Sequence, residues 1–313
     1  KKVSLFYLKA HKIQVSITNY GCIIVQLMVL KNNKFCDVVH GLSTITEYIN
    51  CPEKYFGAIV GRVCNRIKNA TFEIDNVKYR TTPNQAPHSL HSNAMFSSRV
   101  WDVVSYSDCE LVLSTFSPHL EEGFPGNLRT IVKYSLSDSS LKIQITAETD
   151  TPTAVSMTSH PFFSVDQGFK MQLFARQFVK LTNDSISDGV QECAGFWDFS
   201  TFKKVFDDDY QSLAQNDSQL QNGNGVDHCF LFHQNNLGRF LLRNQILMKV
   251  KSNQKAAHIY TGNYLNGIEG KYGEFYQQRS CVCVEPEIVP GKIQEMILRP
   301  GEEYKWETEY EFE

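Results

Sequence analysis

The sequence has none of the short motifs that mark the common nucleotide-binding and hydrolase sites. It contains no G-x-G-x-x-G loop, no Walker phosphate loop and no G-x-S-x-G nucleophile elbow. No apolar run approaches membrane-spanning length, and a net charge of −3 leaves no basic surplus for nucleic acid. These absences weigh against a nucleotide enzyme of the usual folds, and we expect neither a membrane nor a nucleic acid as a partner.

The sequence also lacks the pattern of a disulfide framework. Its nine cysteines are odd in number and scattered, and no signal peptide is visible. We therefore expect free thiols in a cytoplasmic protein. His88 and His91 are close enough in sequence to form a metal-binding pair, but no Cys or His spacing elsewhere completes a tetrahedral site. We therefore expect no metal.

Helix signals are scarce, and short strands dominate. Apolar and polar residues alternate in runs bounded by turn residues, for example at 111–116, 128–136 and 141–148. Further runs at 55–60 and 240–250 predict strands as well. Many short strands with turns between them indicate an all-β sandwich or barrel. Because no internal repeat or linker is visible, we expect one domain over residues 1–313.

Two local signals are specific enough to predict single elements. Thr44 and Glu47 have the spacing of a capping box, which predicts one short helix after Thr44. Asp75-Asn76 lies between two alternating runs, which predicts a tight hairpin.

The stretch 281–291 places a carboxyl group at the end of an apolar strand. Period-two geometry puts Cys281, Cys283 and Glu285 on one face. Pro286 has no N–H for the ladder, so we expect regular pairing to end there. An unpaired buried charge is costly. Glu285 is therefore either a strand-end residue that points into water or a residue that is partnered and functional.

Three other positions combine polar side chains with unusual settings. His160 precedes Pro161, which favours an extended backbone, and aromatic residues follow; this suits an imidazole with a tuned pKa or a buried structural one. Arg62 and Arg66 fit either sugar hydroxyls or surface charge. Asp227 begins an apolar run, and Asp is a poor strand former. We therefore expect Asp227 to have a polar partner.

From end to end the chain resembles the aldose 1-epimerases, the galactose mutarotases. The matching segments include Asn19-Tyr20-Gly21, Tyr55-Phe56-Gly57-Ala58, Gly61-Arg62-Val63-Cys64-Asn65-Arg66, Ser89-Leu90-His91, Gly123-Phe124-Pro125-Gly126-Asn127, Ser159-His160, Val226-Asp227-His228, Tyr260-Thr261-Gly262-Asn263, Glu285 with Pro290, and Leu298-Arg299-Pro300-Gly301. The resemblance implies a large antiparallel β-sandwich, called a supersandwich, with few short helices and a sugar site in a cleft on one sheet. It implies interconversion of the α- and β-anomers of free hexoses such as galactose and glucose, without cofactor or metal.

The resemblance also implies roles for individual residues. Glu285 would be the base that takes the proton of the C1 hydroxyl, and His160 the acid that protonates the ring oxygen. The other implied sugar contacts are His91 near the ring oxygen, Asn65, Arg66 and Asp227 at hydroxyls, Phe162 stacked near the sugar, and His258 beside it. A small-molecule sugar is the implied partner, and we expect a monomer or a weak homodimer.

The chain departs from the family pattern around this site. Ser92-Asn93 stands where the family usually has Gly-Gly, His88 where Asn is usual, and His258 and Glu287 where Gln is usual. If Glu287 faces the cleft, it should couple electrostatically to Glu285; alternatively it points to solvent or pairs with Lys292. The departures leave two other functions open. One is an epimerase of hexose 6-phosphates, which would need several Arg or Lys residues; the other is a sugar-binding homologue with little or no turnover.

Overall fold

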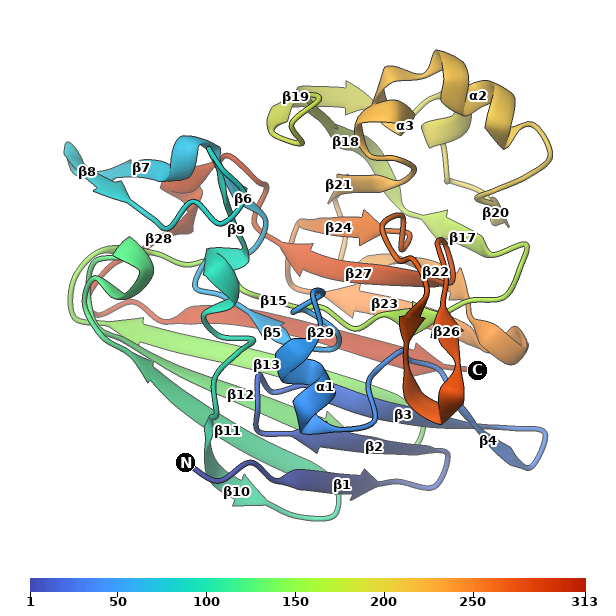
Figure 1. Cartoon of the computed structure of the whole chain (residues 1–313), viewed down its shortest axis with the longest axis horizontal. Helices are drawn as coiled ribbons and strands as arrows, with labels where there is room; N and C mark the ends of the chain where they lie inside the picture. Colours follow the sequence, from blue (N-terminus) through green and yellow to red (C-terminus); the bar gives the residue numbers. More distant parts are fainter.

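The computed structural model describes all residues, 1–313, and its regular structure is almost entirely β (Figure 1). The largest sheet has nine antiparallel strands. In spatial order they are β10 (Asp102–Tyr106), β11 (Glu110–Ser117), β12 (Leu128–Leu136), β13 (Ser140–Thr149), β29 (Tyr304–Phe312), β23 (Leu247–Ser252), β22 (Asn236–Leu241), β17 (Lys170–Leu173) and β20 (Lys203–Lys204). The C-terminal strand β29 therefore lies inside the sheet, between β13 and β23.

A second sheet has six strands and carries the polar residues discussed below. Its order is β16 (Phe163–Ser164), β27 (Cys281–Glu287), β24 (Ala256–Tyr260), β21 (Asp227–Phe232), β18 (Ala175–Leu181) and β19 (Ser187–Glu192). A third sheet consists of β1 (Leu5–Lys9), β2 (Ile13–Thr18), β3 (Ile24–Lys31) and β4 (Lys34–Asp37).

Five short strand pairs complete the fold. They are β14 (Thr153–Ala154) with β28 (Ile297–Leu298), β5 (Ile59–Val60) with β15 (Thr158–Ser159), β25 (Ile268–Glu269) with β26 (Phe275–Tyr276), β6 (Arg66–Ile67) with β9 (Ser89–Leu90), and β7 (Thr71–Ile74) with β8 (Val77–Arg80). The expected all-β, antiparallel architecture with few short helices is thus confirmed.

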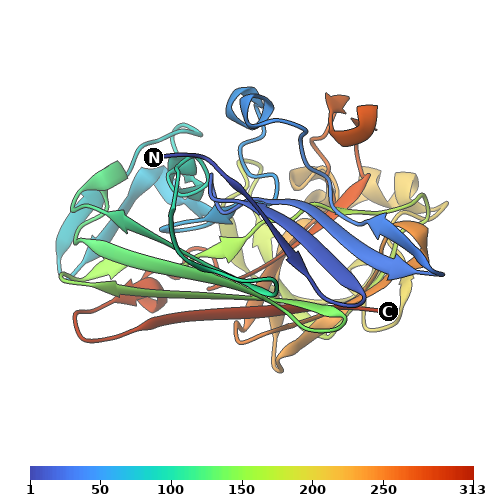
Figure 2. The ribbon, with the colours of Figure 1, turned by 90° about the horizontal axis from the view of Figure 1, so that it is seen from below.

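One hydrophobic core joins the three large sheets. A cluster of 62 buried residues includes Val15 of the four-stranded sheet, Ile143 and Trp306 of the nine-stranded sheet, and Phe230 and Val284 of the six-stranded sheet. In Figure 2 the blue strands of the four-stranded sheet cross the long green strands of the nine-stranded sheet at an angle. Each of the three sheets therefore packs one face against the shared core. The other face of the six-stranded sheet is left available for a site.

The alternation predicted for β27 is present, but the strand is longer than expected. Val282 and Val284 face the main core, whereas Cys281 and Cys283 belong to a second cluster on the opposite face. Pro286 does not end the strand, because it pairs opposite Ala257 within the ladder. Its carbonyl accepts a hydrogen bond from Trp306 Nε1 (2.6 Å), so the main chain of Pro286 points away from β24 at this position. The N–H that proline lacks is therefore not needed for a hydrogen bond to β24.

Both specific local predictions are confirmed. Helix α1 (Ile45–Asn50) begins after Thr44, and the reciprocal bonds between Thr44 and Glu47 form the capping box. The hairpin of β7 and β8 turns at Asp75-Asn76, where both residues have positive φ. The capping and turn residues act on their immediate neighbours, so the sequence alone reports them well.

Other segment predictions need correction. The strand expected over 55–60 is reduced to β5, and the run 240–250 is broken by a 3-10 turn at Arg243–Gln245, where Asn244 adopts a left-handed conformation. Two further helices, α2 (Tyr210–Asn216) and α3 (Ser218–Asn222), had not been predicted. All three α-helices are too short to span a membrane.

Candidate active site

A pocket opens on the face of the six-stranded sheet that lies opposite the core. Its empty volume, including the part open to solvent, is about 530 Å³, within the range of small-molecule sites. The lining residues are Glu53, Tyr55, Asn65, Arg66, Leu90, His91, His160, Asp227, His258, Tyr260, Tyr264 and Glu285. Seven of the eight residues predicted for the site are therefore brought together, although they come from distant parts of the chain.

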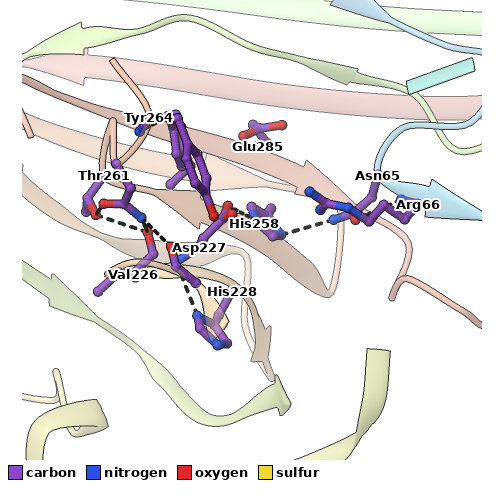
Figure 3. Close-up of polar contacts among 12 residues, drawn as sticks. Asn65, Arg66, Val226, Asp227, His228, His258, Thr261, Tyr264 and Glu285 are labelled. Carbon is purple, nitrogen blue, oxygen red and sulfur yellow. Dashed lines mark hydrogen bonds and ion pairs between the residues drawn. The ribbon is translucent and has the colours of Figure 1, made fainter. Parts of the chain in front are cut away.

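Strand register places three of these side chains next to one another (Figure 3). His258 on β24 stands directly opposite Glu285 on β27, and opposite Cys229 on β21. Asp227 lies two positions along β21 from Cys229, so it is the diagonal neighbour of His258 on the same face. The predicted polar partner of Asp227 is thus His258, whose Nε2 lies 2.8 Å from Asp227 Oδ1.

Glu285 and His160 form the most deeply buried contact of the pocket. His160 follows β15, and its main-chain N–H donates to Ala58 O at 2.9 Å. Its Nε2 lies 3.3 Å from Glu285 Oε1, and both side chains are less than 10% exposed. The sequence left open whether Glu285 points into water; in the structure it faces the pocket and His160.

Burial pushes the two groups toward their neutral forms. It raises the pKa of Glu285 well above the usual range of a glutamate, and the negative charge of Glu287 raises it further. Burial also lowers the pKa of His160 to about 3. Both shifts favour the form in which each group is neutral and the carboxyl group of Glu285 holds the proton. A transfer across the 3.3 Å contact would give a carboxylate and an imidazolium.

Phe162 is the one predicted site residue that does not line the pocket. It is fully buried. Its ring stacks on His160, with centroids 4.9 Å apart and planes 19° apart, and it also packs on Phe56 at 4.3 Å. The expectation of a direct stack on the sugar is thus corrected, because the ring is buried against His160 and Phe56 and does not line the pocket. Phe162 supports the His160 ring from behind.

Asn65, Arg66 and His91 lie around the short strand pair of β6 and β9. Asn65 has a positive φ of 60°, a conformation that Asn tolerates better than most residues. Its main-chain N–H donates to His91 Nδ1 at 3.1 Å, and the His91 main-chain N–H donates back to Asn65 O at 3.1 Å. Arg66 lines the pocket, while its Nε donates to Gln85 Oε1 at 2.7 Å. This pair of segments therefore fixes one wall of the pocket.

Arg62 plays neither of the two roles left open for it. The side chain is fully buried and makes no contact with the pocket. Its guanidinium donates only to protein oxygens: Ser117 Oγ and O, Pro118 O, Pro125 O, Gly126 O and Thr153 Oγ1. Arg62 thus ties down the 117–126 loop, and only Arg66 of the two arginines reaches the site.

Glu287 faces the site and not the solvent. It is buried, its Oε1 accepts from Asn65 Nδ2 at 3.1 Å, and its Oε2 accepts from Cys64 Sγ at 3.2 Å. Lys292 pairs instead with Glu295, at 3.0 Å. Of the two alternatives for Glu287, the structure therefore supports the one in which its carboxyl group can influence Glu285.

Five lining residues had not been predicted. Glu53 and Tyr55 lie in the loop before β5, Leu90 ends β9, and Tyr260 and Tyr264 end β24 and begin the following turn. Burial raises the pKa of Glu53 to about 7. No residue pattern marks Glu53, but Tyr55, Leu90 and Tyr260 lie in segments that match the family pattern and could have been found that way.

The donor geometry suits an organic oxygen ligand better than a metal ion. One nitrogen each from His91 and His160 and an oxygen of Glu285 lie within 4.8 Å of one another. However, His91 Nδ1 already accepts the Asn65 N–H, so the neutral ring carries its proton on Nε2 and has no free lone pair to offer. The suspected pair of His88 and His91 does not form, because His88 bonds Asn69 and Asp184.

Comparison with known proteins gives a consistent result over the whole chain. Residues 4–311 match the family model described as aldose 1-epimerase. The chain is 30% identical to the galactose mutarotase of Rattus norvegicus over 330 residues, which cover 99% of this chain and 94% of the relative. It is also 30% identical to the aldose 1-epimerase of Escherichia coli (strain K12) over 281 residues, covering 82% of this chain and 80% of the relative.

Solved structures share the fold. A GalM/aldose epimerase homologue from C. elegans superposes with a TM-score of 0.90 at 24% identity, covering 100% of this chain and 99% of the other. A galactose 1-epimerase from Lactobacillus acidophilus NCFM superposes with a TM-score of 0.86 at 22% identity, covering 100% and 98%. At these identities the two structures establish the architecture alone.

Proposed function

The chain belongs to the aldose 1-epimerase family and is an isomerase of that family; we propose that Glu285 and His160 carry its reaction, on a free hexose such as galactose or glucose. The observation that carries the proposal is the contact between the two side chains. They approach to 3.3 Å and both are buried, so together they can supply one base and one acid.

The reaction follows from these two roles. Glu285, as carboxylate, takes the proton of the C1 hydroxyl, while His160, as imidazolium, gives its proton to the ring oxygen. The bond from C1 to the ring oxygen breaks, and the carbonyl at C1 forms. The aldehyde rotates about C1–C2, and the freed hydroxyl attacks the other face of the carbonyl. That hydroxyl returns its proton to His160 and the new C1 hydroxyl takes one from Glu285, so both groups end as they began.

The remaining lining residues would hold the sugar in place. We propose that Arg66 and Asp227 contact ring hydroxyls and that the Nε2–H of His91 donates to a sugar oxygen. His258 also lines the pocket and orients Asp227. Tyr55, whose ring centroid lies 4.5 Å from that of His91, offers an aromatic surface in place of the one expected from Phe162.

The charge of the pocket argues against a sugar phosphate. Glu53, Asp227 and Glu285 all line it, and Arg66 is the only arginine or lysine that does. A phosphate would need several cationic donors to offset its own charge, and the acidic residues supply none. The free sugar is therefore the favoured substrate over its 6-phosphate.

Polarimetry tests the proposal directly. Freshly dissolved α-galactose, α-glucose and glucose 6-phosphate would each be followed to anomeric equilibrium, with and without the protein. We expect the protein to accelerate the interconversion of the anomers of the free sugars over the rate in buffer. The interconversion of glucose 6-phosphate should stay at the rate in buffer. Acceleration of the phosphate alone would contradict the assigned substrate, and acceleration of neither would leave a sugar-binding homologue as the better description.

We further propose a cytoplasmic protein that is a monomer or weak homodimer. All nine cysteines are free in the structure, and free thiols are typical of reducing compartments. Light scattering after size-exclusion chromatography, at several protein concentrations, measures the oligomeric state. A mass near twice 35.8 kDa that persists on dilution would contradict a weak association.

A further inference from the structure

The orientation of the Asn65 side chain is determined by its neighbour in the chain. The main-chain N–H of Arg66 lies 2.8 Å from Asn65 Oδ1. An N–H can only donate, so the atom that faces it must be the amide oxygen. The other end of the amide is therefore the NH₂ group, which has two hydrogens to donate and cannot accept. This assignment determines which ring nitrogen of the neighbouring histidine carries a proton.

Both hydrogens of the Asn65 amide are taken up by buried acceptors. Asn65 Nδ2 lies 3.0 Å from His258 Nδ1 and 3.1 Å from Glu287 Oε1. His258 Nδ1 must accept, so the neutral ring carries its proton on Nε2 and donates it to Asp227 Oδ1 at 2.8 Å. Asp227 is thereby held by one oxygen and keeps the other for a ligand. Asn65 has no amide hydrogen left for a sugar hydroxyl.

The main chain of Asn65 determines the tautomer of a second histidine in the same way. Its N–H donates to His91 Nδ1 at 3.1 Å, so His91 also carries its proton on Nε2. His91 lines the pocket. The ring therefore presents a hydrogen-bond donor there, as a sugar oxygen requires.

The third histidine of the pocket, His160, makes no hydrogen bond to Asn65. His160 Nδ1 is buried and has no hydrogen-bond partner, and its Nε2 faces Glu285 Oε1 at 3.3 Å. No donor of Asn65 reaches this ring, so Nε2 is not fixed as a donor and can both give and receive a proton in one catalytic cycle.

We propose that Asn65 is a positioning residue that sets the tautomers of His91 and His258 and makes no contact with His160. The sequence had suggested a direct contact between Asn65 and the sugar. In the assigned role Asn65 acts through the two rings: one presents a donor and the other orients Asp227. The consequence for sugar binding rests on the proposed function, whereas the tautomers themselves do not.

Nitrogen-15 NMR of the histidine rings in the wild-type protein is the first test. Signals of His91 and His258 are assigned by their loss in the variants H91Q and H258Q. We expect both rings to show an unprotonated Nδ1 and a protonated Nε2 near neutral pH. A protonated Nδ1 in either ring would overturn the proposal, whether or not the protein turns over any sugar.

The variant N65D tests the tautomers of His258 and His91 separately. Asp has the shape of Asn but cannot donate to His258 Nδ1, while its main-chain N–H still reaches His91. We expect the His258 ring to gain a proton on Nδ1 and the His91 signals to stay as they are. An imidazolium at position 258 would draw on the negative charge of Asp227 and weaken the hydrogen bond from Asp227 to the sugar. Hydrogen bonds to charged groups are worth about tenfold or more in affinity, so KM should rise by up to about that factor while kcat changes less.

One further variant completes the design. N235D adds the same charge on an exposed turn outside the pocket and should change neither KM nor the ring signals. Wild-type His258 signals and KM in N65D would contradict the role of the amide. If N65D fails to fold, the tautomers of the wild-type protein still decide the question.

Discussion

Glu285 and Glu287 stand two positions apart on β27 and turn to the same face of the sheet, and both are almost completely buried. Glu285 lines the pocket, whereas Glu287 lies behind it against Asn65 and Cys64. After burial itself, Glu287 is the largest cause of the raised pKa of Glu285. The electrostatic setting of the proposed base is therefore tuned by a residue that does not line the pocket.

This relationship predicts a pH effect of E287Q. The pair of Glu285 and His160 works while it holds one proton, and the acid limb of the kcat/KM profile marks the uptake of a second. Removing the negative charge of Glu287 lowers the proton affinity of the pair, so the acid limb should move to lower pH. The measurement is a pH–rate profile of both proteins on the same sugar.

E295Q is the matched control for that experiment, because Glu295 is exposed beside Lys292. Its profile should overlie that of the wild type. Superimposable acid limbs for E287Q and wild type would show that Glu287 does not couple to the base.

The catalytic pair itself predicts a loss of rate without a loss of binding. E285Q removes the base and H160N removes the acid, and each should lower kcat by about 10²–10⁴-fold. Sugar binding, measured by calorimetry, should be largely kept because the other lining residues are unchanged. H233N, on an exposed histidine, should behave as wild type. A folded E285Q or H160N with near-normal kcat would show that the roles are wrongly assigned.

The loop that carries His91 predicts a stability gain. Residues His91 to Ala94 all have positive φ, between 49° and 56°, although none is glycine. A left-handed conformation costs an ordinary residue about 1–2 kcal/mol, and Ala94 gains no side-chain hydrogen bond in return. We expect A94G to raise the free energy of unfolding by about 1 kcal/mol in urea titrations.

A glycine placed in a regular helix gives the opposite sign. A214G in α2 should lower the free energy of unfolding by about 1 kcal/mol, because glycine is a poor helix former. If A94G lowered stability as A214G does, left-handed strain in the 91–94 loop would be refuted.

Buried Arg62 predicts a large stability loss. R62M removes every donor to the oxygens of Ser117, Pro118, Pro125, Gly126 and Thr153 and leaves buried acceptors unpaired. Each unpaired buried group costs about 1–3 kcal/mol, so we expect a total loss of at least about 3 kcal/mol. R129M, at an exposed position, should stay within about 0.5 kcal/mol of wild type. Equal urea midpoints for the two variants would contradict this account.

The donor set predicts that a chelator has no effect on turnover. Glu285 and His160 supply both proton transfers, and His91 presents a proton instead of a lone pair. Activity measured by polarimetry should therefore be the same after dialysis against EDTA. Loss of activity under EDTA, with recovery on addition of zinc, would refute a mechanism that runs on these two side chains.

Features that depend on neighbours in the chain were predictable from the sequence. The alternation of Cys281, Cys283 and Glu285, the capping box at Thr44 and the turn at Asp75-Asn76 all follow from geometry that repeats over two to four residues. The resemblance to the aldose 1-epimerases added the residues of the site, since it covers the whole chain. It could not show which side chains contact each of these residues.

Only the tertiary structure decided which polar side chains meet. Arg62 and Arg66 are four residues apart and look alike in the sequence, yet one is sealed under the 117–126 loop and the other reaches the pocket. Phe162 packs on Phe56, and Glu287 turns toward Asn65, because segments more than a hundred residues apart come together there. A charge or ring has its role set by the groups that pack around it, and in this fold those groups come from other strands and loops.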